Sequence, residues 1–250
     1  MSLRFSLSIF VSFALALPLA VSAAPLTDSD LDGIPDIWEA HVFKTDLALA
    51  DSDGDGKNDR QEILAGWSPV AKNTKIKDED ADKDGLVDRL ELAFGVDPTN
   101  ADSDGDGYKD GEEVMSAWSP TSTGDIRLGK SIRIDLSDQR MEKRVAGIVL
   151  ASFPISGGLP KTPTPVGTFK VINKHPRAWS RSFGLWMPYW MAFTNRGHGI
   201  HELPEWPGGY KEGKNHLGRP ASHGCVRLGV GPAKEMYDWA PVGTPVIIER

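Results

Sequence analysis

The strongest constraint on the fold of this chain is an acidic loop pattern that occurs four times in its first half. Each copy reads Asp-x-Asp-x-Asp-Gly-x5-Glu and carries a further Asp at its ninth position. Carboxylates at alternating positions converge on one hard cation, the glycine permits a sharp turn, and the final glutamate closes the shell with two oxygens. The carboxylates of the four copies are Asp28, Asp30, Asp32, Asp36 and Glu39; Asp51, Asp53, Asp55, Asp59 and Glu62; Asp80, Asp82, Asp84, Asp88 and Glu91; and Asp102, Asp104, Asp106, Asp110 and Glu113.

We interpret the four loops as structural calcium sites. Their 20 carboxylates are most of the 25 acidic residues between residues 24 and 124, and so many close like charges repel one another unless a cation balances them. Magnesium is a poorer match because it gives up its bound water reluctantly to an all-protein cage. The alternative is a solvated acidic or disordered stretch, which does not explain a fourfold match.

The spacing of the loops indicates a duplicated pair with little room for helices. The loops begin at residues 28, 51, 80 and 102, and Gly66-Trp67-Ser68-Pro69 recurs as Ala117-Trp118-Ser119-Pro120. Gaps this short cannot hold the two full flanking helices of an EF-hand. The loops resemble thrombospondin type 3 and related bacterial calcium repeats, in which a loop leads into one short helix. We therefore expect short helices near 37–40 and 90–93, with Trp38 and Phe43 in a small core.

Charge is distributed unevenly along the chain, which indicates two domains with different roles. The net charge is −16 over residues 24–124 and +8 over residues 125–250, although the whole chain carries only −7. We therefore place a calcium-binding repeat module at 24–124 and a second domain at 125–250. The basic balance of the second domain suits an anionic polymer, the alternative being a plain solvated surface. We expect no nucleic-acid partner.

Residues 1–23 read as a secretory signal peptide. A basic start precedes an apolar run from Phe5 to Leu17 and a tail of small residues that ends at Ala23, which is the pattern of an export signal. The run is too short for a membrane span, and no later segment offers one. An uncleaved anchor is the alternative. We expect an exported protein of the periplasm or cell envelope, without a stable membrane span.

The second domain reads as mainly β, with one short helix. Alternating or continuous apolar residues predict strands over residues 132–136, 146–156, 168–172 and 245–248. A helix is expected over 232–239, because Pro232 is favoured in a first helical turn. Short strands separated by glycine and proline are typical of a β-sandwich or barrel.

The chain has a single cysteine, Cys225, so it cannot form an internal disulfide. A thiol is a nucleophile only as its thiolate, and it needs a nearby base or positive charge to lower its pKa. We interpret Cys225 as a nucleophile and His201 as the base that takes its proton. The alternative is a buried, inert thiol.

Other histidine and tryptophan side chains of this domain are expected to be mostly structural. We assign that role to His175, His198 and His216. Four tryptophans surround His201 in the sequence and are expected to be mainly core, the alternative being the lining of a substrate groove; they are Trp179, Trp186, Trp190 and Trp206.

Four motifs follow one another in the second domain, at residues 163–169 (PTPVGTF), 187–190 (MPYW), 199–201 (GIH) and 217–228 (LGRPASHGCVRL). Together they resemble the L,D-transpeptidase (YkuD-type) catalytic domain over residues 128–249. A lone His-Gly-Cys would be weak evidence, whereas four ordered motifs are specific. The resemblance implies an L,D-transpeptidase-like sandwich or barrel.

The resemblance also assigns roles to the nucleophile and its base. Cys225 is the nucleophile, and His201 is oriented by a backbone carbonyl that here belongs to Glu202. The family usually has a small residue at the position of Glu202. A carboxylate there that turned inward would raise the pKa of His201.

The rest of the motif surrounds the thiol. Gly224 lets the backbone approach a substrate, and backbone N–H groups here, including that of Cys225, are natural oxyanion donors. Ser222 and His223 match the loop, and His223 holds the loop or touches substrate. Arg227 offers a forked donor for a substrate carboxylate.

The implied function is an exported cysteine L,D-transpeptidase that acts on peptidoglycan stem peptides and needs no cofactor for catalysis. Cys225 forms a thioester with the third stem residue, terminal D-alanine leaves, and an amine accepts the acyl group, giving a 3→3 cross-link or attachment to a wall protein. One alternative is an L,D-carboxypeptidase or amidase-type hydrolase on the same site. Another is a calcium-dependent wall-binding module with the second domain as a scaffold, against which the intact motif argues.

Overall fold

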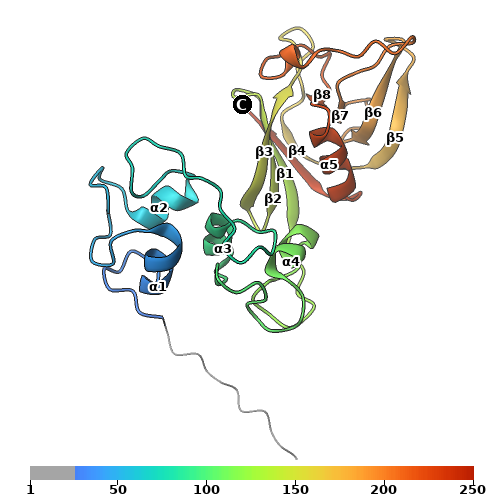
Figure 1. Cartoon of the computed structure of the whole chain (residues 1–250). Coiled ribbons are helices and arrows are strands. Elements are labelled where there is room, and N and C mark those ends of the chain that lie inside the picture. Colours follow the sequence, from blue (N-terminus) through green and yellow to red (C-terminus); the bar gives the residue numbers. More distant parts are fainter. Residues whose placement is uncertain (1–25) are drawn as a thin grey trace, which may run out of the picture.

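The structure, a computed structural model, describes residues 26–250, so the predicted signal peptide over residues 1–23 lies outside the described residues. Figure 1 shows short helices and loops in the N-terminal half and strands in the C-terminal half. Within residues 26–250, no helix combines the length and the apolar character needed to cross a membrane.

Each acidic loop leads into one short helix that begins at the aspartate in the ninth loop position. The helices are α1 (Asp36–Trp38), which continues into a π-helical turn η1 (Glu39–Phe43), α2 (Asp59–Leu64), α3 (Asp88–Phe94) and α4 (Asp110–Ser116). A negative charge at a helix start is favoured by the helix dipole, and the aspartate also ties the loop down: the N–H of Ser52 donates to Asp59 over 2.8 Å. The short helices predicted near 37–40 and 90–93 are confirmed.

The four loops pack as two halves with different cores. The first half has a small core of its own, formed by Ile34, Trp38, Phe43, Ile63 and Leu92. In the second half, Leu86 and Val114 belong to the same apolar cluster as Ile132 and Met141 of the sheet. The change of charge after residue 124 is therefore not a break in the apolar core, and loops three and four pack as part of the sheet domain.

Nine strands form one curled sheet in the order β4-β9-β1-β2-β3-β8-β7-β6-β5. Their bounds are β1 (Lys130–Asp135), β2 (Arg140–Val145), β3 (Ile148–Ser156), β4 (Gly167–Lys170), β5 (Asn173–Ser180), β6 (Leu185–Ala192), β7 (Gly199–Glu202), β8 (Val226–Leu228) and β9 (Pro245–Glu249). Neighbours are antiparallel except β1 with β9 and β7 with β8, which are parallel. The predicted mainly β fold is confirmed.

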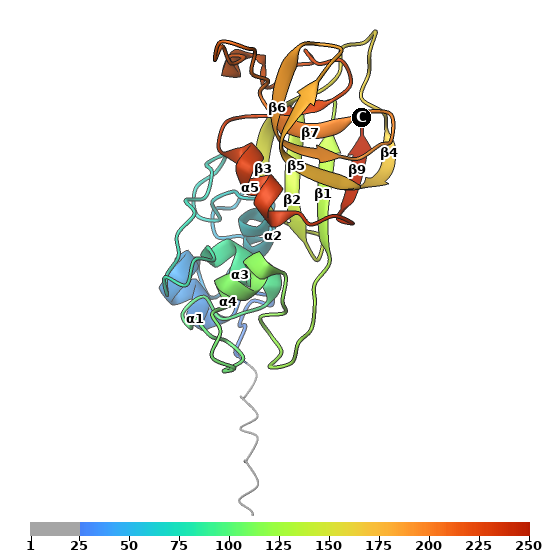
Figure 2. The same ribbon diagram turned by 90° about the vertical axis from the view of Figure 1, so that its right-hand side faces the viewer.

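One α-helix of the sheet domain, α5 (Pro232–Trp239), has the predicted bounds and proline in its first turn. It packs against β6, β7 and β8, whose labels lie around it in Figure 1; Figure 2 shows it beside the sheet from another side. It buries Ala233, Met236 and Trp239. The four predicted strands are present, whereas β2, β5, β6, β7 and β8 were not predicted. β5 is a mostly exposed edge strand that contains Pro176 and lacks alternation, and β6 is nearly all apolar.

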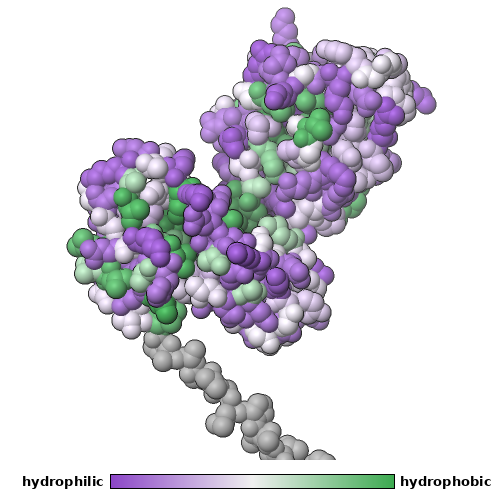
Figure 3. Space-filling model, viewed as in Figure 1, coloured by the Kyte–Doolittle hydropathy of each residue, from purple (hydrophilic) through white to green (hydrophobic). Residues whose placement is uncertain are grey.

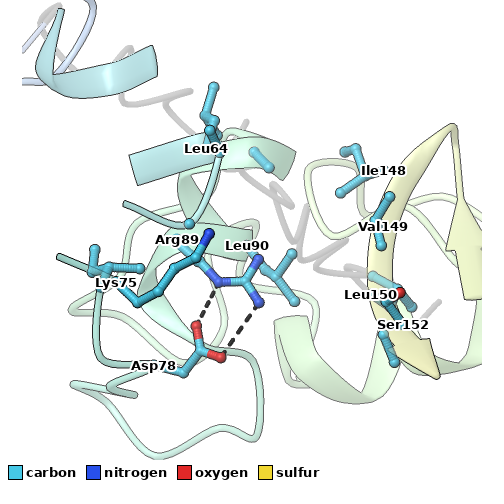
Figure 4. A pocket seen from close by; sticks show the side chains of 14 residues that line it. Leu64, Lys75, Asp78, Arg89, Leu90, Ile148, Val149, Leu150 and Ser152 are labelled. Carbon is cyan, nitrogen blue, oxygen red and sulfur yellow. Dashed lines mark hydrogen bonds and ion pairs between the residues drawn. The ribbon is translucent and has the colours of Figure 1, made fainter. Parts of the chain in front are cut away.

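A cavity of about 660 Å³ lies between the first half of the acidic module and the sheet. Figure 4 shows Leu64 and Leu90 on one side of it and Ile148 and Val149 on the other, and Figure 3 shows hydrophobic surface in the hollow between these parts. Consecutive residues 148–152 of β3 line the cavity, because β3 pairs with β8 only at its C-terminal end. The acidic module thus lies over a sheet edge that would otherwise be open.

Core substitutions should separate the two halves of the module. Ile63→Ala should destabilise the first half by about 2–5 kcal/mol without affecting the sheet, because Ile63 is fully buried in the separate core. Leu86→Ala should weaken α4 and β1–β3 together, because Leu86 lies in the shared core. Hydrogen-exchange mass spectrometry measures both effects, and faster exchange of β1 in Ile63→Ala would contradict the division.

Candidate active site and cation sites

The candidate nucleophile and base are carried by two adjacent parallel strands. β7 and β8 pair with His201 opposite Arg227, and Cys225 directly precedes β8. Side chains two residues apart in an extended strand share a face, so Cys225, His201 and Arg227 lie on one face of the sheet. All three line one cavity. On the opposite face, Ile200 and Val226 are fully buried and fix the strands in place.

The loop before the thiol is held by Ser222, which is fully buried. Its hydroxyl donates to the carbonyl oxygen of Cys225 over 2.5 Å and accepts from the backbone N–H of Gly224 over 3.1 Å. Gly224 has φ +105°, and a Cβ there would lie 2.9 Å from the ring of His198. A side chain at residue 224 is therefore excluded by both backbone conformation and space.

His201 is buried and oriented by the backbone. Its Nδ1–H donates to the carbonyl oxygen of Glu202 over 2.5 Å, which leaves the Nε2 lone pair available, and its ring stacks on Trp190 with centroids 5.9 Å apart. Burial lowers the pKa of His201 to about 4, and the charge of Arg227 acts in the same direction. The imidazole is therefore neutral near pH 7 and can accept a proton.

The thiol of Cys225 is also neutral in the resting site. Burial raises its pKa above the ordinary value, while a backbone hydrogen bond with Gly199 and the charge of Arg227 oppose that effect. Sγ lies 3.7 Å from the carbonyl oxygen of Gly197. A neutral thiol and a neutral imidazole that line the same cavity suit general-base activation at the moment of attack.

Glu202, where the family pattern has a small residue, turns its side chain away from the imidazole. Its Oε1 accepts from Nζ of Lys211 over 2.5 Å, and the residue is 3% exposed. Its contact with His201 is through the backbone carbonyl alone. The carboxylate therefore does not raise the pKa of the base.

Arg227 is held by a residue that no sequence motif indicated. Its Nη1 donates to both carboxylate oxygens of Glu212, over 2.9 and 3.1 Å, and to the carbonyl oxygen of Ala221 over 3.2 Å. Glu212 lies in the connection between β7 and β8, which has no periodic pattern from which its position could be read. The expected role of Arg227 with a substrate carboxylate requires a free donor edge, and one amino group is already bound inside the protein.

The cavity that contains these residues has a volume of about 570 Å³. Its aromatic lining includes Phe183, Trp190 and Trp206, and the ring of His223 stacks on Phe183 with centroids 4.7 Å apart. Two of the four tryptophans thus line the site, while Trp179 is 41% exposed. Such a polar and aromatic cavity suits a peptide substrate whose backbone and side chains both need contacts.

The structure brings three of the five predicted cation ligands of each loop together, while the aspartate in the ninth position accepts from a backbone N–H of its own loop. The first three aspartates of each loop offer oxygens that lie within 4.8 Å of one another, and Asp84, Glu91 and Asp110 form a further buried group that joins loops three and four. Buried carboxylate oxygens without a hydrogen-bond partner occur in all four loops, at Asp30, Asp32, Glu39, Asp53, Glu62, Asp82, Glu91, Asp104, Asp110 and Glu113.

Burial and the neighbouring carboxylates disfavour the charged form of these groups when no cation is bound. Burial, reinforced by neighbouring carboxylates, raises the pKa of Glu91 to about 9, and burial raises that of Glu113 to about 7. A shell of close oxygen donors that the protein leaves unpaired fits a hard divalent cation. The donor set therefore fits calcium, the cation expected from the loop pattern.

Comparison with known proteins defines the class of the sheet domain. Residues 129–248 match the family model of the L,D-transpeptidase catalytic domain, YkuD. This is the family that the four ordered motifs resemble, and the match covers nearly the whole sheet domain. The chain is 30% identical over 124 residues to YciB and 31% identical over 105 residues to YkuD, both Bacillus subtilis proteins that carry L,D-transpeptidase names.

These relatives are matched over part of their length. The two alignments cover 47% and 41% of this chain and 64% and 55% of the relatives, so the chain spans less than two thirds of each. Among solved structures, an L,D-transpeptidase from Mycobacterium smegmatis is 28% identical, with 52% of this chain and 65% of that chain covered and a TM-score of 0.43. One from Mycobacterium tuberculosis is 24% identical, with 50% and 59% covered and a TM-score of 0.44.

The neutral resting site predicts how alkylation of Cys225 depends on pH. Iodoacetamide reacts with the thiolate, and because burial raises the pKa of this thiol, the reaction should be slow near pH 7 and accelerate into the alkaline range. Intact-mass spectrometry of samples quenched over time measures the rate. A rate plateau between about pH 5 and pH 7, which a thiolate and imidazolium ion pair produces, would contradict the neutral site.

Proposed function

We propose that this protein is an exported cysteine L,D-transpeptidase of peptidoglycan. The observation that carries the proposal is the placement of Cys225 and His201 on one sheet face, in one cavity, within a matched L,D-transpeptidase catalytic domain. The family match supports the reaction class, and the free Nε2 of His201 supports the role of base. The signal-peptide pattern of residues 1–23 supports export.

In the acylation step, His201 Nε2 takes the thiol proton while Cys225 Sγ forms a bond to the carbonyl carbon of the third stem residue. The backbone N–H of Cys225 is the candidate donor to the oxyanion, because that of Gly224 is bound to the Ser222 hydroxyl. Collapse of the tetrahedral intermediate breaks the amide bond, and the imidazolium returns the proton to the D-alanine amine that leaves. A thioester on Cys225 and a neutral His201 remain.

In the transfer step, His201 takes a proton from the amine of the acceptor as that amine attacks the thioester. The new amide forms, the bond to sulfur breaks, and the proton returns to Cys225. A neighbouring stem gives a 3→3 cross-link, and a wall-attached protein gives an anchored product. Water as acceptor would make the enzyme a carboxypeptidase or amidase-type hydrolase on the same residues, whereas a free D-amino acid would exchange the terminal residue of the stem.

Incubation with a disaccharide-tetrapeptide should release D-alanine and leave a thioester on the protein. Cys225→Ala and His201→Gln should abolish D-alanine release, the first because it removes the nucleophile and the second because it removes the base. His175→Gln is the matched control, since His175 is exposed on β5 and outside the cavity. Mass spectrometry detects the thioester and distinguishes dimers from trimmed stems. A folded wild-type protein with neither product would refute the proposal.

We also propose that the four acidic loops bind calcium as a structural cation. The residues that would hold it are the carboxylates of the repeated pattern, many of whose buried oxygens have no other partner. The cation would supply positive charge that offsets repulsion within each loop and would fix the start of the helix that follows. A calcium-dependent wall-binding module is the alternative role for this half, and it is compatible with an active sheet domain.

Millimolar calcium should raise the unfolding temperature, and EDTA should lower it. A cation at 100 times its dissociation constant stabilises the folded state by about 2.7 kcal/mol per site. Glu113→Gln should weaken the calcium effect, because Glu113 is buried with an unpartnered oxygen. Its neighbour Glu112, exposed and outside the pattern, provides the control Glu112→Gln. Identical melting curves with calcium and with EDTA would refute the cation role.

A further inference from the structure

Glu212 is a buried carboxylate that the two reaction steps above do not use. It lies in the connection between β7 and β8 and lines the cavity that holds Cys225. Both of its oxygens accept from Nη1 of Arg227, and its backbone N–H donates to the carbonyl oxygen of Pro204 over 2.9 Å. Glu212 and Arg227 are each 9% exposed. Burying a carboxylate costs desolvation free energy, which a well-placed partner of opposite charge must offset.

That partner, Arg227, lies on the same sheet face as the nucleophile and the base. Arg227 pairs opposite His201 across the two parallel strands and stands two residues after Cys225 on the same face. Burial has the largest effect on the pKa of both reactive groups, and the side-chain charge that acts on both is that of Arg227. An unbalanced guanidinium here would hold His201 in its neutral form and hinder the proton transfer on which attack depends.

We propose that Glu212 is a positioning residue whose carboxylate holds Nη1 of Arg227 on the sheet face that carries Cys225 and His201 and offsets the charge of the guanidinium. The inference rests on the proposed function for its role in catalysis. It also narrows the expectation for Arg227: Nη1 is bound to Glu212 and Ala221, so only the rest of the guanidinium is left for a substrate carboxylate.

Other titratable groups on this side of the cavity have different partners. His216 Nδ1 lies 2.9 Å from Oε1 of Glu212 and adds to the same cluster. The carboxylate of Glu202 is bound to Lys211, and His198 Nδ1 lies 3.0 Å from the hydroxyl of Thr194. Arg227 takes part in none of these contacts. Among the described residues, Glu212 is the carboxylate whose charge acts on the Arg227 guanidinium.

Charge-changing variants test the proposal through the pH profile of Cys225 alkylation by iodoacetamide. Glu212→Gln leaves the guanidinium uncompensated, so the profile should move to lower pH and alkylation at pH 7 should be roughly tenfold faster, as expected for an added positive charge near a thiolate. Arg227→Gln leaves the carboxylate uncompensated, so its profile should move to higher pH. The double variant should return toward the wild-type profile, because both charges are gone.

Controls separate this role from a purely structural one. Glu212→Asp keeps the charge and should keep the wild-type midpoint, and Glu205→Gln breaks an ion pair with Arg177 outside the cavity and should leave the profile unchanged. Circular dichroism reports whether each variant folds; if Glu212→Gln does not fold, the opposite shift in Arg227→Gln carries the test. A lower melting temperature with unchanged midpoints in both single variants would overturn the proposal.

Substrate kinetics supply the second readout. Glu212→Gln should lower kcat for D-alanine release with little change in KM, because the residue acts through the base and nucleophile. A lower KM with an unchanged alkylation midpoint would overturn the proposal, since it would show a freed Arg227 binding the substrate. Alkylation needs no peptidoglycan, so loss of the alkylation shift and failure of the transpeptidase assay are separate results.

Discussion

β7 and β8 run parallel, so the chain leaving β7 cannot return through a tight turn and must cross over to the start of β8. This connection carries Trp206 and Glu212 into the cavity wall and ends in the loop held by Ser222. The same pairing sets His201 opposite Arg227 and puts Cys225 on their face of the sheet. A single pairing thus determines both the reactive constellation and the wall around it, and the ion pair from Glu212 to Arg227 ties the wall to the strand.

Burial determines the resting protonation states of the two candidate reactive groups. It lowers the pKa of His201 and raises that of Cys225, so both groups are neutral at rest, and in the proposed reaction charge separates only as the thiol attacks. The surrounding protein dipoles and charges must stabilise the separated charges, because little water can reorganise around a buried group. A guanidinium bound to a carboxylate is suited to this environment: it supplies a fixed dipole without a net charge that would suppress the base.

The sequence predicted secondary structure correctly where a local pattern is compatible with only one kind of element. Proline in the first turn predicted α5 with its observed bounds, and the resemblance of the acidic loops to calcium repeats predicted the short helices near 37–40 and 90–93. β5 and β6 were missed because Pro176 and a polar edge in one, and a nearly continuous apolar run in the other, hide the alternation of a half-buried strand. Glu212 was missed because its role depends on its contact with Arg227. That residue is 15 positions further along the chain, and no periodic pattern links the two.

The two halves of the acidic module are similar in sequence, but they pack into different apolar cores. In the second half, the carboxylate of Asp84 accepts from the backbone N–H of Gly111 over 2.6 Å and so links loop three to α4, while Leu86 and Val114 lie in the core of the sheet. Order imposed on these loops therefore reaches β1 and β2 through packed side chains. The first half packs around a separate core, to which α3 of the second half contributes Leu92. Ordering of the first two loops therefore reaches the rest of the protein only through α3. The two similar pairs of acidic loops thus differ in their packing, and the second pair is structurally part of the sheet domain.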